Sequence, residues 1–296
     1  MHAELSPEVV ESYVLAGEIH KRVRHSTIGH IKAGVKLLDV AVQVEQEIAA
    51  QDAKPAFPCN ISINHIASHD TPTRDDERIF RNGDVVKIDF GVCVDGYIAD
   101  AAFTAEVGTR DHEKLINAAE RSLAAGISVV KPGTFIRDIG RAVQAEAVSE
   151  GYCTLKDLLG HSLKRNCLHG GLTIPSYDDG SFLRVREGDV LAIEPFVTSG
   201  SGVIVRANRG NIYQLIRNEA IYAHGALQKS LLAHISKNYQ NFPFAERWLP
   251  DTEGLSGLVR SACLYNYPVL VEADLAPVAQ AESTVIVDRE GCRVIA

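Results

Sequence analysis

The chain has 296 residues, of which 46% are hydrophobic and 23% charged, a composition typical of a globular protein with one large or two moderate domains. The net charge of −8 argues against strong nucleic-acid binding, and no apolar run reaches the roughly 18 residues of a membrane-spanning helix. The six cysteines include no C-x-x-C pair, which argues against a zinc ribbon and favours reduced thiols in a cytosol.

From residue 6 to residue 206 the sequence alternates between helical and strand patterns. Residues 6–52 predict two helices from the spacing of their apolar side chains, and the first is expected to begin at Ser6-Pro7-Glu8, where a capping residue, a proline and an acid follow one another. Later segments are expected to be β-rich at 57–107, helical at 111–130 and 134–150, and β again at 183–206.

The character of the sequence changes between residues 210 and 270. HGALQKSLLAHISKN (224–238) and NFPFAERWL (241–249) are predicted to form short helices. The chain is then expected to return to strand at 267–272 and 283–287.

The chain also repeats itself weakly, at a nearly constant offset of about 100 residues. KAGVKLLDVAVQVEQEI (32–48) aligns with KPGTFIRDIGRAVQAEA (131–147), residues 61–69 align with 161–169, and NGDVVKIDFG (82–91) aligns with EGDVLAIEPF (187–196). The repeat predicts two α/β halves related by a pseudo-two-fold axis. It places Asp89 of one half over Glu194 of the other.

KIDFGVCVDGYIAD (87–100) carries two acids within strands that are otherwise apolar. Asp95-Gly96 has the composition of a two-residue hairpin turn, which would place Asp89 opposite Ala102. Ala102 shares a face with Asp100 because side chains alternate along a strand. The two carboxylates are therefore expected to be diagonal neighbours, about 7–8 Å apart at the backbone.

Two buried carboxylates on one face need a counter-charge, because desolvation and mutual repulsion oppose their ionisation. Lys87 has the same strand parity as Asp89 and is one candidate, and a divalent metal is the other. Further ligands for a metal are available in apolar contexts at Glu194, Glu282 and His161. Four carboxylates with one imidazole suit Mn, Fe, Co or Zn, and bridging carboxylates can hold two such ions about 3.5–4 Å apart.

With these residues in view, the chain resembles the type II methionine aminopeptidases of the pita-bread fold, in their short archaeal form. The matching motifs are PAFPCNISINHIASHDTP (55–72), GDVVKIDFGVCVDGYIAD (83–100), LLGHSLKRNCLHGG (158–171), EGDVLAIEPF (187–196) and VAQAESTVIV (278–287). The resemblance implies an α+β pita-bread fold with a catalytic domain at 1–209 and 271–296. A winged-helix-like helical insert at 210–270 would mark the type II subclass.

The resemblance also implies a ligand set for two divalent ions, Co, Mn, Fe or Zn. Asp100 and Glu282 would bridge the two ions. Asp89 would serve one ion, and His161 and Glu194 would serve the other.

Further roles follow from the same resemblance. His69 would contact the scissile amide, and His169 would stabilise the developing oxyanion. Glu194 would move a proton from water to the leaving amine, and Phe57 and Leu168 would line the pocket for the methionine side chain.

The implied function is the removal of the initiator methionine from nascent polypeptides when the second residue is small. The polypeptide would be a substrate at the ribosome or after its release. We expect a cytoplasmic monomer with no membrane partner. The alternatives are a metal-free pita-bread binding or scaffold protein and a related Xaa-Pro metallopeptidase. The chain departs from the family pattern at Asp70, Asn166 and Leu168, which affects the expected pocket shape but not the expected ligands.

Overall fold

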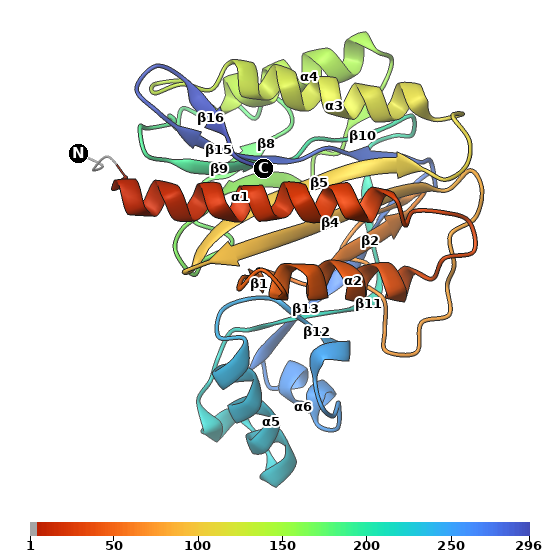
Figure 1. The fold of residues 1–296 in the computed structure, drawn as a ribbon, viewed down its shortest axis with the longest axis vertical. Helices are drawn as coiled ribbons and strands as arrows, with labels where there is room; N and C mark the ends of the chain where they lie inside the picture. Colours follow the sequence, from red (N-terminus) through yellow and green to blue (C-terminus); the bar gives the residue numbers. More distant parts are fainter. Residues whose placement is uncertain (1–4) are drawn as a thin grey trace.

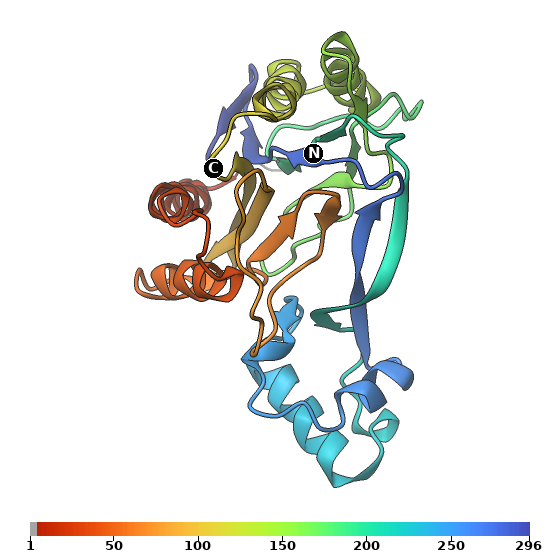
Figure 2. The same cartoon turned by 90° about the vertical axis from the view of Figure 1, so that its right-hand side faces the viewer.

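The structure is a computed structural model that describes residues 5–296, and two similar α/β halves form its main body (Figure 1). Each half packs two helices against one antiparallel sheet, so that the helices lie on the outside of the molecule (Figure 2). The helices are α1 (Pro7–Ile28) and α2 (Leu37–Ala49) in the first half, and α3 (Glu113–Ser128) and α4 (Ile136–Ser149) in the second. The two predicted helix pairs are confirmed.

The first sheet is built around β4 (Val85–Val94), which pairs antiparallel with β5 (Tyr97–Glu106), β2 (Asn60–Ile63) and β1 (Lys54–Pro55). Its outer face carries the largest apolar core, which α1 and α2 cover. Gly17 of α1 has no room for a side chain, because a Cβ there would lie 2.0 Å from the carbonyl oxygen of Ile295.

The second sheet repeats this arrangement with five antiparallel strands in the order β16-β15-β9-β7-β8. Their bounds are β7 Leu159–Ser162, β8 Thr173–Pro175, β9 Val190–Ile193, β15 Ser283–Val287 and β16 Cys292–Val294. In this half β9 holds the place that β4 holds in the first. The two halves predicted from the repeat are therefore present.

The two sheets meet along β5, where backbone groups are matched in reciprocal pairs. Glu282 and Ala102 exchange N–H···O bonds of 3.0 and 3.4 Å. The Thr284 hydroxyl donates to the carbonyl of Asp100 at 2.7 Å and accepts from its N–H at 2.8 Å. Because buried backbone groups must find partners, these bonds fix Asp100 and Glu282 on either side of the seam.

A third sheet, in the order β12-β11-β13-β3, lies beside this body and extends below it (Figure 2). Its strands are β3 Ile66–Ser68, β11 Ile204–Leu215, β12 Phe244–Ala245 and β13 Leu264–Glu272. A small sheet joins β6 Cys153–Thr154, β10 Phe196–Thr198 and β14 Val278–Gln280.

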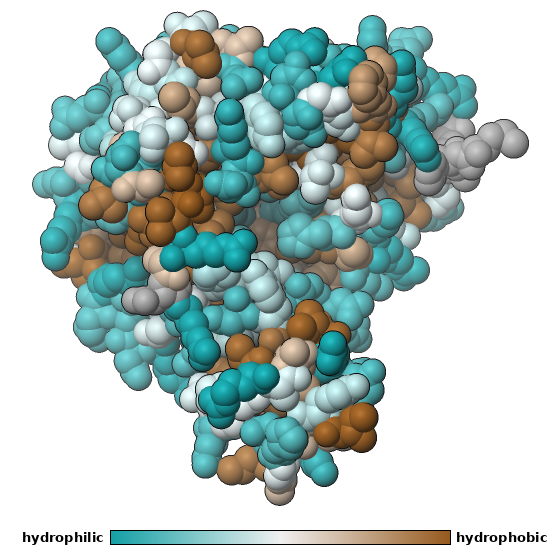
Figure 3. Space-filling model, turned by 180° about the vertical axis from the view of Figure 1, so that it is seen from behind, coloured by the Kyte–Doolittle hydropathy of each residue, from teal (hydrophilic) through white to brown (hydrophobic). Residues whose placement is uncertain are grey.

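The lower lobe contains helices at the end of the third sheet that lies away from the main body. In Figure 3 it projects below that body. Its elements are α5 (Gly225–Asn238), α6 (Leu255–Arg260) and the 3-10 turns η1 (Ala220–Tyr222) and η2 (Glu246–Trp248). One apolar cluster is confined to this region, from Tyr213 to Leu264. The division of the chain at 210 and 270 stays a prediction.

The helix predicted for NFPFAERWL is wrong. Phe244 and Ala245 form strand β12, paired with Tyr213 and Ile212 of β11, and only Glu246–Trp248 makes a 3-10 turn. Residues 244–245 are extended because they pair with β11, about thirty residues earlier in the chain. Local residue spacing does not indicate such a distant partner. Among residues 5–296, no helix combines the length and apolar character that a membrane crossing needs.

Candidate metal centre

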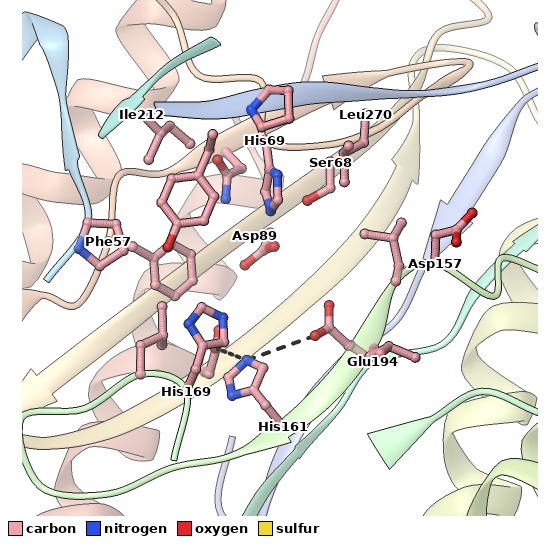
Figure 4. Close-up of a pocket in the computed structure, with 18 of the residues that line it drawn as sticks. Phe57, Ser68, His69, Asp89, Asp157, His161, His169, Glu194, Ile212 and Leu270 are labelled. Atoms are coloured by element: carbon pink, nitrogen blue, oxygen red, sulfur yellow. Dashed lines mark ion pairs between the residues drawn. The ribbon is translucent and has the colours of Figure 1, made fainter. Parts of the chain in front are cut away.

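A cavity of about 470 Å³ lies between the two halves and the third sheet (Figure 4). Every residue singled out from the sequence as a site residue lines it: Phe57, His69, Asp89, Asp100, His161, Leu168, His169, Glu194 and Glu282. These side chains come from five separate segments of the chain, so the fold brings together what the sequence keeps apart.

The β4–β5 hairpin positions the first two acids. Asp89 is paired with Ala102 and Gly91 with Asp100, the register expected from a two-residue turn. Asp95 and Gly96 have φ values of 52° and 89°, and positive φ at both central residues is what a type I′ turn requires. The predicted hairpin is confirmed, and Asp89 and Asp100 share one buried face.

Three groups form the tightest cluster. Ligand atoms of Asp100, His161 and Glu282 all lie within 4.8 Å of one another. The His161 Nε2 atom is 3.5 Å from Asp100 Oδ2 and 3.9 Å from Glu194 Oε1. Glu194 follows directly on β9, as Asp89 lies within β4, so each half contributes an acid from its central strand.

Gln280 connects Asp89 to this cluster. Its Nε2 lies 3.4 Å from Asp89 Oδ2 and 3.3 Å from Glu282 Oε2. The sequence analysis did not identify Gln280. Its position two residues before Glu282 was an available signal, since strand residues two apart share a face.

The acids are strongly perturbed by their surroundings. Burial raises the pKa of Asp89 to about 7. Burial, followed by the charges of the neighbouring acids, raises the pKa values of Asp100, Glu194 and Glu282 well above their ordinary range. These carboxyls can ionise together only if a nearby cation balances their charges.

Lys87 does not supply that cation. Its ammonium group donates to the carbonyl oxygens of Asn64 at 2.9 Å and Val278 at 2.8 Å, and burial lowers its pKa to about 7. This alternative to a metal is therefore wrong. Within residues 5–296, the buried Oδ1 atoms of Asp89 and Asp100 have no hydrogen-bond partner. Unpartnered carboxylate oxygens beside an imidazole fit a divalent metal ion.

Two further histidines face the acids from opposite walls of the cavity (Figure 4). His69 is half-buried, has a φ of 64°, and packs edge-on against Tyr267 with ring centres 5.2 Å apart. Burial lowers its pKa to about 4, so its ring is neutral at pH 7. His169 is exposed to the cavity, and its ring lies 4.6 Å from that of His161.

One end of the cavity is apolar. Phe57 and Leu168, predicted for the methionine pocket, belong to one apolar cluster, and Ile212 lies at the same end as Phe57 in Figure 4. The residues of the cavity lining that were not predicted include Ile212, Pro243 and Tyr267. These three belong to the third sheet and the lower lobe. They are ordinary apolar residues, and only their position in the fold distinguishes them.

Of the three residues that depart from the family pattern, Asp70 and Asn166 lie outside the cavity lining. Asp70 receives two hydrogen bonds from the Arg78 guanidinium, at 2.6 and 3.1 Å, and Asp76 binds the same guanidinium. Asn166 has a φ of 56°, and its N–H donates to the carbonyl of Gly96 at 2.7 Å. Asp70 and Asn166 thus act in local loop structure, whereas Leu168 lines the cavity.

Comparisons with known proteins agree with this geometry. The model of metallopeptidase family M24 matches residues 11–223. A methionine aminopeptidase from Thermococcus kodakarensis is 41% identical over 292 residues, covering 96% of this chain and 98% of that protein. Among solved structures, a methionine aminopeptidase from Thermotoga maritima (TM-score 0.75, 23% identity, 100% and 99% of the two chains) and a thermophilic Arx1 (0.85, 20%, 99% and 91%) share the fold.

Proposed function

The chain belongs to metallopeptidase family M24, and on this premise we propose that it removes the N-terminal methionine of proteins and peptides by metal-dependent hydrolysis when the second residue is small. The observation that carries the proposal is the convergence of four acids, three of them buried and Glu194 half-buried, and three histidines on one cavity with an apolar end. Methionine aminopeptidases from Thermococcus kodakarensis and Methanocaldococcus jannaschii are 41% and 40% identical over 96% and 97% of the chain.

The proposed metal ligands are Asp89, Asp100, His161, Glu194 and Glu282. Two divalent ions, Mn, Co, Fe or Zn, would suit this set, with Asp100 and Glu282 shared between them. Bound there, they would polarise the scissile carbonyl and activate water at neutral pH.

Other residues of the chain would move protons and hold the substrate. We assign the proton transfer to Glu194, whose carboxyl lies at the edge of the acid cluster, 3.9 Å from His161 Nε2 and partly exposed to the cavity. His169 would donate a hydrogen bond to the carbonyl oxygen as negative charge develops on it. His69, neutral and fixed against Tyr267, would bind the amide nitrogen.

The methionine side chain would occupy the apolar end of the cavity. We propose that Phe57 and Leu168 form one side of this pocket and that Ile212 and Pro243 close the other, since all four line the cavity. We propose that residues 210–270 form an insert subdomain on the catalytic domain of residues 1–209 and 271–296. The insert would complete the methionine pocket.

The proposed substrates are the N-termini of nascent polypeptides, at the ribosome or after release. We propose that the protein acts in the cytoplasm as a monomer. The six cysteines are all free, which agrees with a reducing compartment.

The direct test is metal analysis of the purified protein together with hydrolysis of Met-Ala-Ser in the presence of added Mn, Co or Fe. We expect release of free methionine that a chelator abolishes. Hydrolysis of an Xaa-Pro peptide in preference to Met-Ala-Ser would favour a prolidase-like enzyme. No hydrolysis with any metal would favour a binding protein.

A further inference from the structure

The cavity extends beyond the acids along one row of the third sheet. Arg206 of β11 is paired with Leu270 of β13, and Leu270 is paired with Ser68 of β3. Residues paired directly across antiparallel strands project from the same face, and all three line the cavity. The row therefore runs from beside His69 to an exposed arginine at the rim.

The facing wall is the segment before His161, which contributes Asp157, Leu158 and Leu159. Asp157 and Arg206 are both exposed, and within residues 5–296 neither makes an ion pair or a hydrogen bond through its side chain. The rim thus presents one free cation and one free anion to a ligand.

The two ends of the cavity differ in character. In Figure 4, Phe57 and Ile212 lie at one end, Leu270 and Asp157 lie at the other, and Asp89 and Glu194 lie between them. If the methionine side chain enters the apolar end and its carbonyl reaches the acids, the rest of the substrate leaves through the end that carries Asp157 and Arg206.

We propose that Arg206 and Asp157 select substrates by charge beyond the scissile bond, with Arg206 favouring an acidic side chain at the third or fourth residue. This inference rests on the proposed aminopeptidase function. Ser68 and Arg206 are two strand spacings apart, about 10 Å, and an extended peptide advances about 3.3 Å per residue. Three residues after the bond therefore bring the substrate within reach of Arg206.

Adjacent side chains of an extended peptide point to opposite sides. When one of the third and fourth residues faces Arg206, the other faces Asp157. A glutamate is therefore favoured at one of these two positions, and a lysine is favoured at the other.

The test uses the metal-loaded full-length chain and two series of pentapeptide amides, Met-Ala-Xaa-Ser-Gly and Met-Ala-Ser-Xaa-Gly, with Xaa as Glu, Gln or Lys. Amidation removes the C-terminal carboxylate, which Arg206 would otherwise bind in short peptides. We expect kcat/KM for Glu to exceed that for Lys about two- to fivefold in one series, as for an exposed ion pair, and the order to reverse in the other. The differences should lie in KM and should shrink in high salt.

Variants assign the effect to the two residues. Arg206→Glu should invert the Glu/Lys ratio in the series that favours Glu, and Asp157→Asn should weaken the preference for Lys in the other series. Arg209→Glu is the matched control, because Arg209 is an exposed arginine of the same strand that does not line the cavity, and it should leave both ratios unchanged. Ratios measured within one variant are independent of the fraction of active enzyme.

Equal rates for Glu and Lys in both series, or ratios that Arg206→Glu does not alter, would overturn the charge selection and leave the aminopeptidase function standing. Failure to hydrolyse even the Gln peptides would instead overturn the function itself, and the inference with it.

Discussion

Asp89 shows how burial alone can move an ordinary carboxyl to a pKa near neutrality. Its usual pKa of 3.8 rises to about 7, mainly because the charged form loses its hydration. Burial, and then the charges of neighbouring acids, also raise the pKa values of Asp100, Glu194 and Glu282 well above their ordinary range. Without a cation the site therefore holds protons at neutral pH, and metal binding must release them.

We expect the free energy of unfolding of the metal-free protein to fall as the pH rises from 7 to 8.5. A carboxyl whose pKa is raised by folding stabilises the folded state at low pH, and that contribution is lost as the pH rises through the folded pKa. Each proton retained only by the folded state contributes roughly 1.4 kcal/mol per pH unit to this slope. Lys87, with its lowered pKa, acts in the opposite direction, and Asp89, with a pKa of about 7, contributes only at the lower end of this range. The expected fall in stability therefore depends on Asp100, Glu194 and Glu282, whose pKa values are raised well above their ordinary range.

Urea unfolding in a chelator at pH 7.0 and 8.5 measures this slope. The site histidines contribute little, because above pH 7 they are largely neutral in both states. Added Mn²⁺ should flatten the slope, since the bound ion replaces the protons. A chelated protein that became more stable toward pH 8.5 would contradict the prediction.

Replacement of His161 should affect metal content, whereas replacement of its neighbour His169 should affect kcat. His169→Ala should lower kcat about 10²- to 10³-fold, as the removal of one hydrogen bond to an oxyanion does, and should leave the metal content unchanged. His161→Ala should lower the metal content itself, because His161 lies within the tightest cluster of ligand atoms. Elemental analysis beside steady-state kinetics separates the two. Equal loss of metal in both variants would argue against the roles assigned here.

Among the elements, the β4–β5 hairpin and its neighbours shape the cavity end that we propose as the methionine pocket. Gly91 lies in the middle of β4, opposite Asp100. A Cβ at this position would lie 2.6 Å from Phe57 Cε1 and 2.9 Å from the Ala56 Cβ. A glycine within a strand weakens it, and here its use is to let the Phe57 ring lie against the backbone.

Gly91→Ala should therefore displace Phe57. We expect a loss of about 1–3 kcal/mol in the free energy of unfolding, the usual cost of overpacking, and a higher KM for methionyl peptides. In a Phe57→Leu background the added methyl group should cost less, which a double-mutant cycle by urea unfolding would measure. Additive effects of the two substitutions would show that the ring and the methyl group do not compete for space.

In the whole molecule, a polar contact between α2 and the lower lobe holds the lobe against the body. Glu45 of α2 is largely buried and binds both Arg247 and Trp248 of the lobe, with 2.8 Å between Glu45 Oε2 and the Trp248 indole nitrogen. Arg247 also donates to the Thr71 hydroxyl at 2.7 Å and to the Pro72 carbonyl at 3.0 Å. This contact sets the position of the cavity wall that the lobe contributes.

Glu45→Gln should leave the Arg247 guanidinium, only 4% exposed, without its charged partner. Breaking a buried pair on one side costs about 3–5 kcal/mol, whereas replacing both partners by apolar residues costs much less. We therefore expect Glu45→Gln to lower the free energy of unfolding more than the double variant Glu45→Met/Arg247→Met. Glu45→Gln should also raise KM for methionyl peptides, because a displaced lobe would move Ile212 and Pro243 in the cavity wall. Urea unfolding and peptide kinetics test both parts, and a single variant as stable as the parent chain would refute them.

The features that depend on local chemistry could be predicted from the residues alone. Asp95-Gly96 specified a two-residue turn, and strand parity then placed Asp89 and Asp100 on one face. The internal repeat predicted the two halves and the equivalence of Asp89 and Glu194. These inferences succeed because turn type and side-chain alternation are properties of a few consecutive residues.

Contacts between segments far apart in the sequence became known from the folded chain. The fold placed Gln280 between Asp89 and Glu282, and it directed Lys87 to two carbonyl oxygens instead of the acids. It also placed Arg206 on the cavity rim and turned part of NFPFAERWL into a strand. The physical reason is the same in each case: hydrogen bonding and desolvation depend on neighbours that lie far away in the sequence, and residue type and local spacing do not specify them.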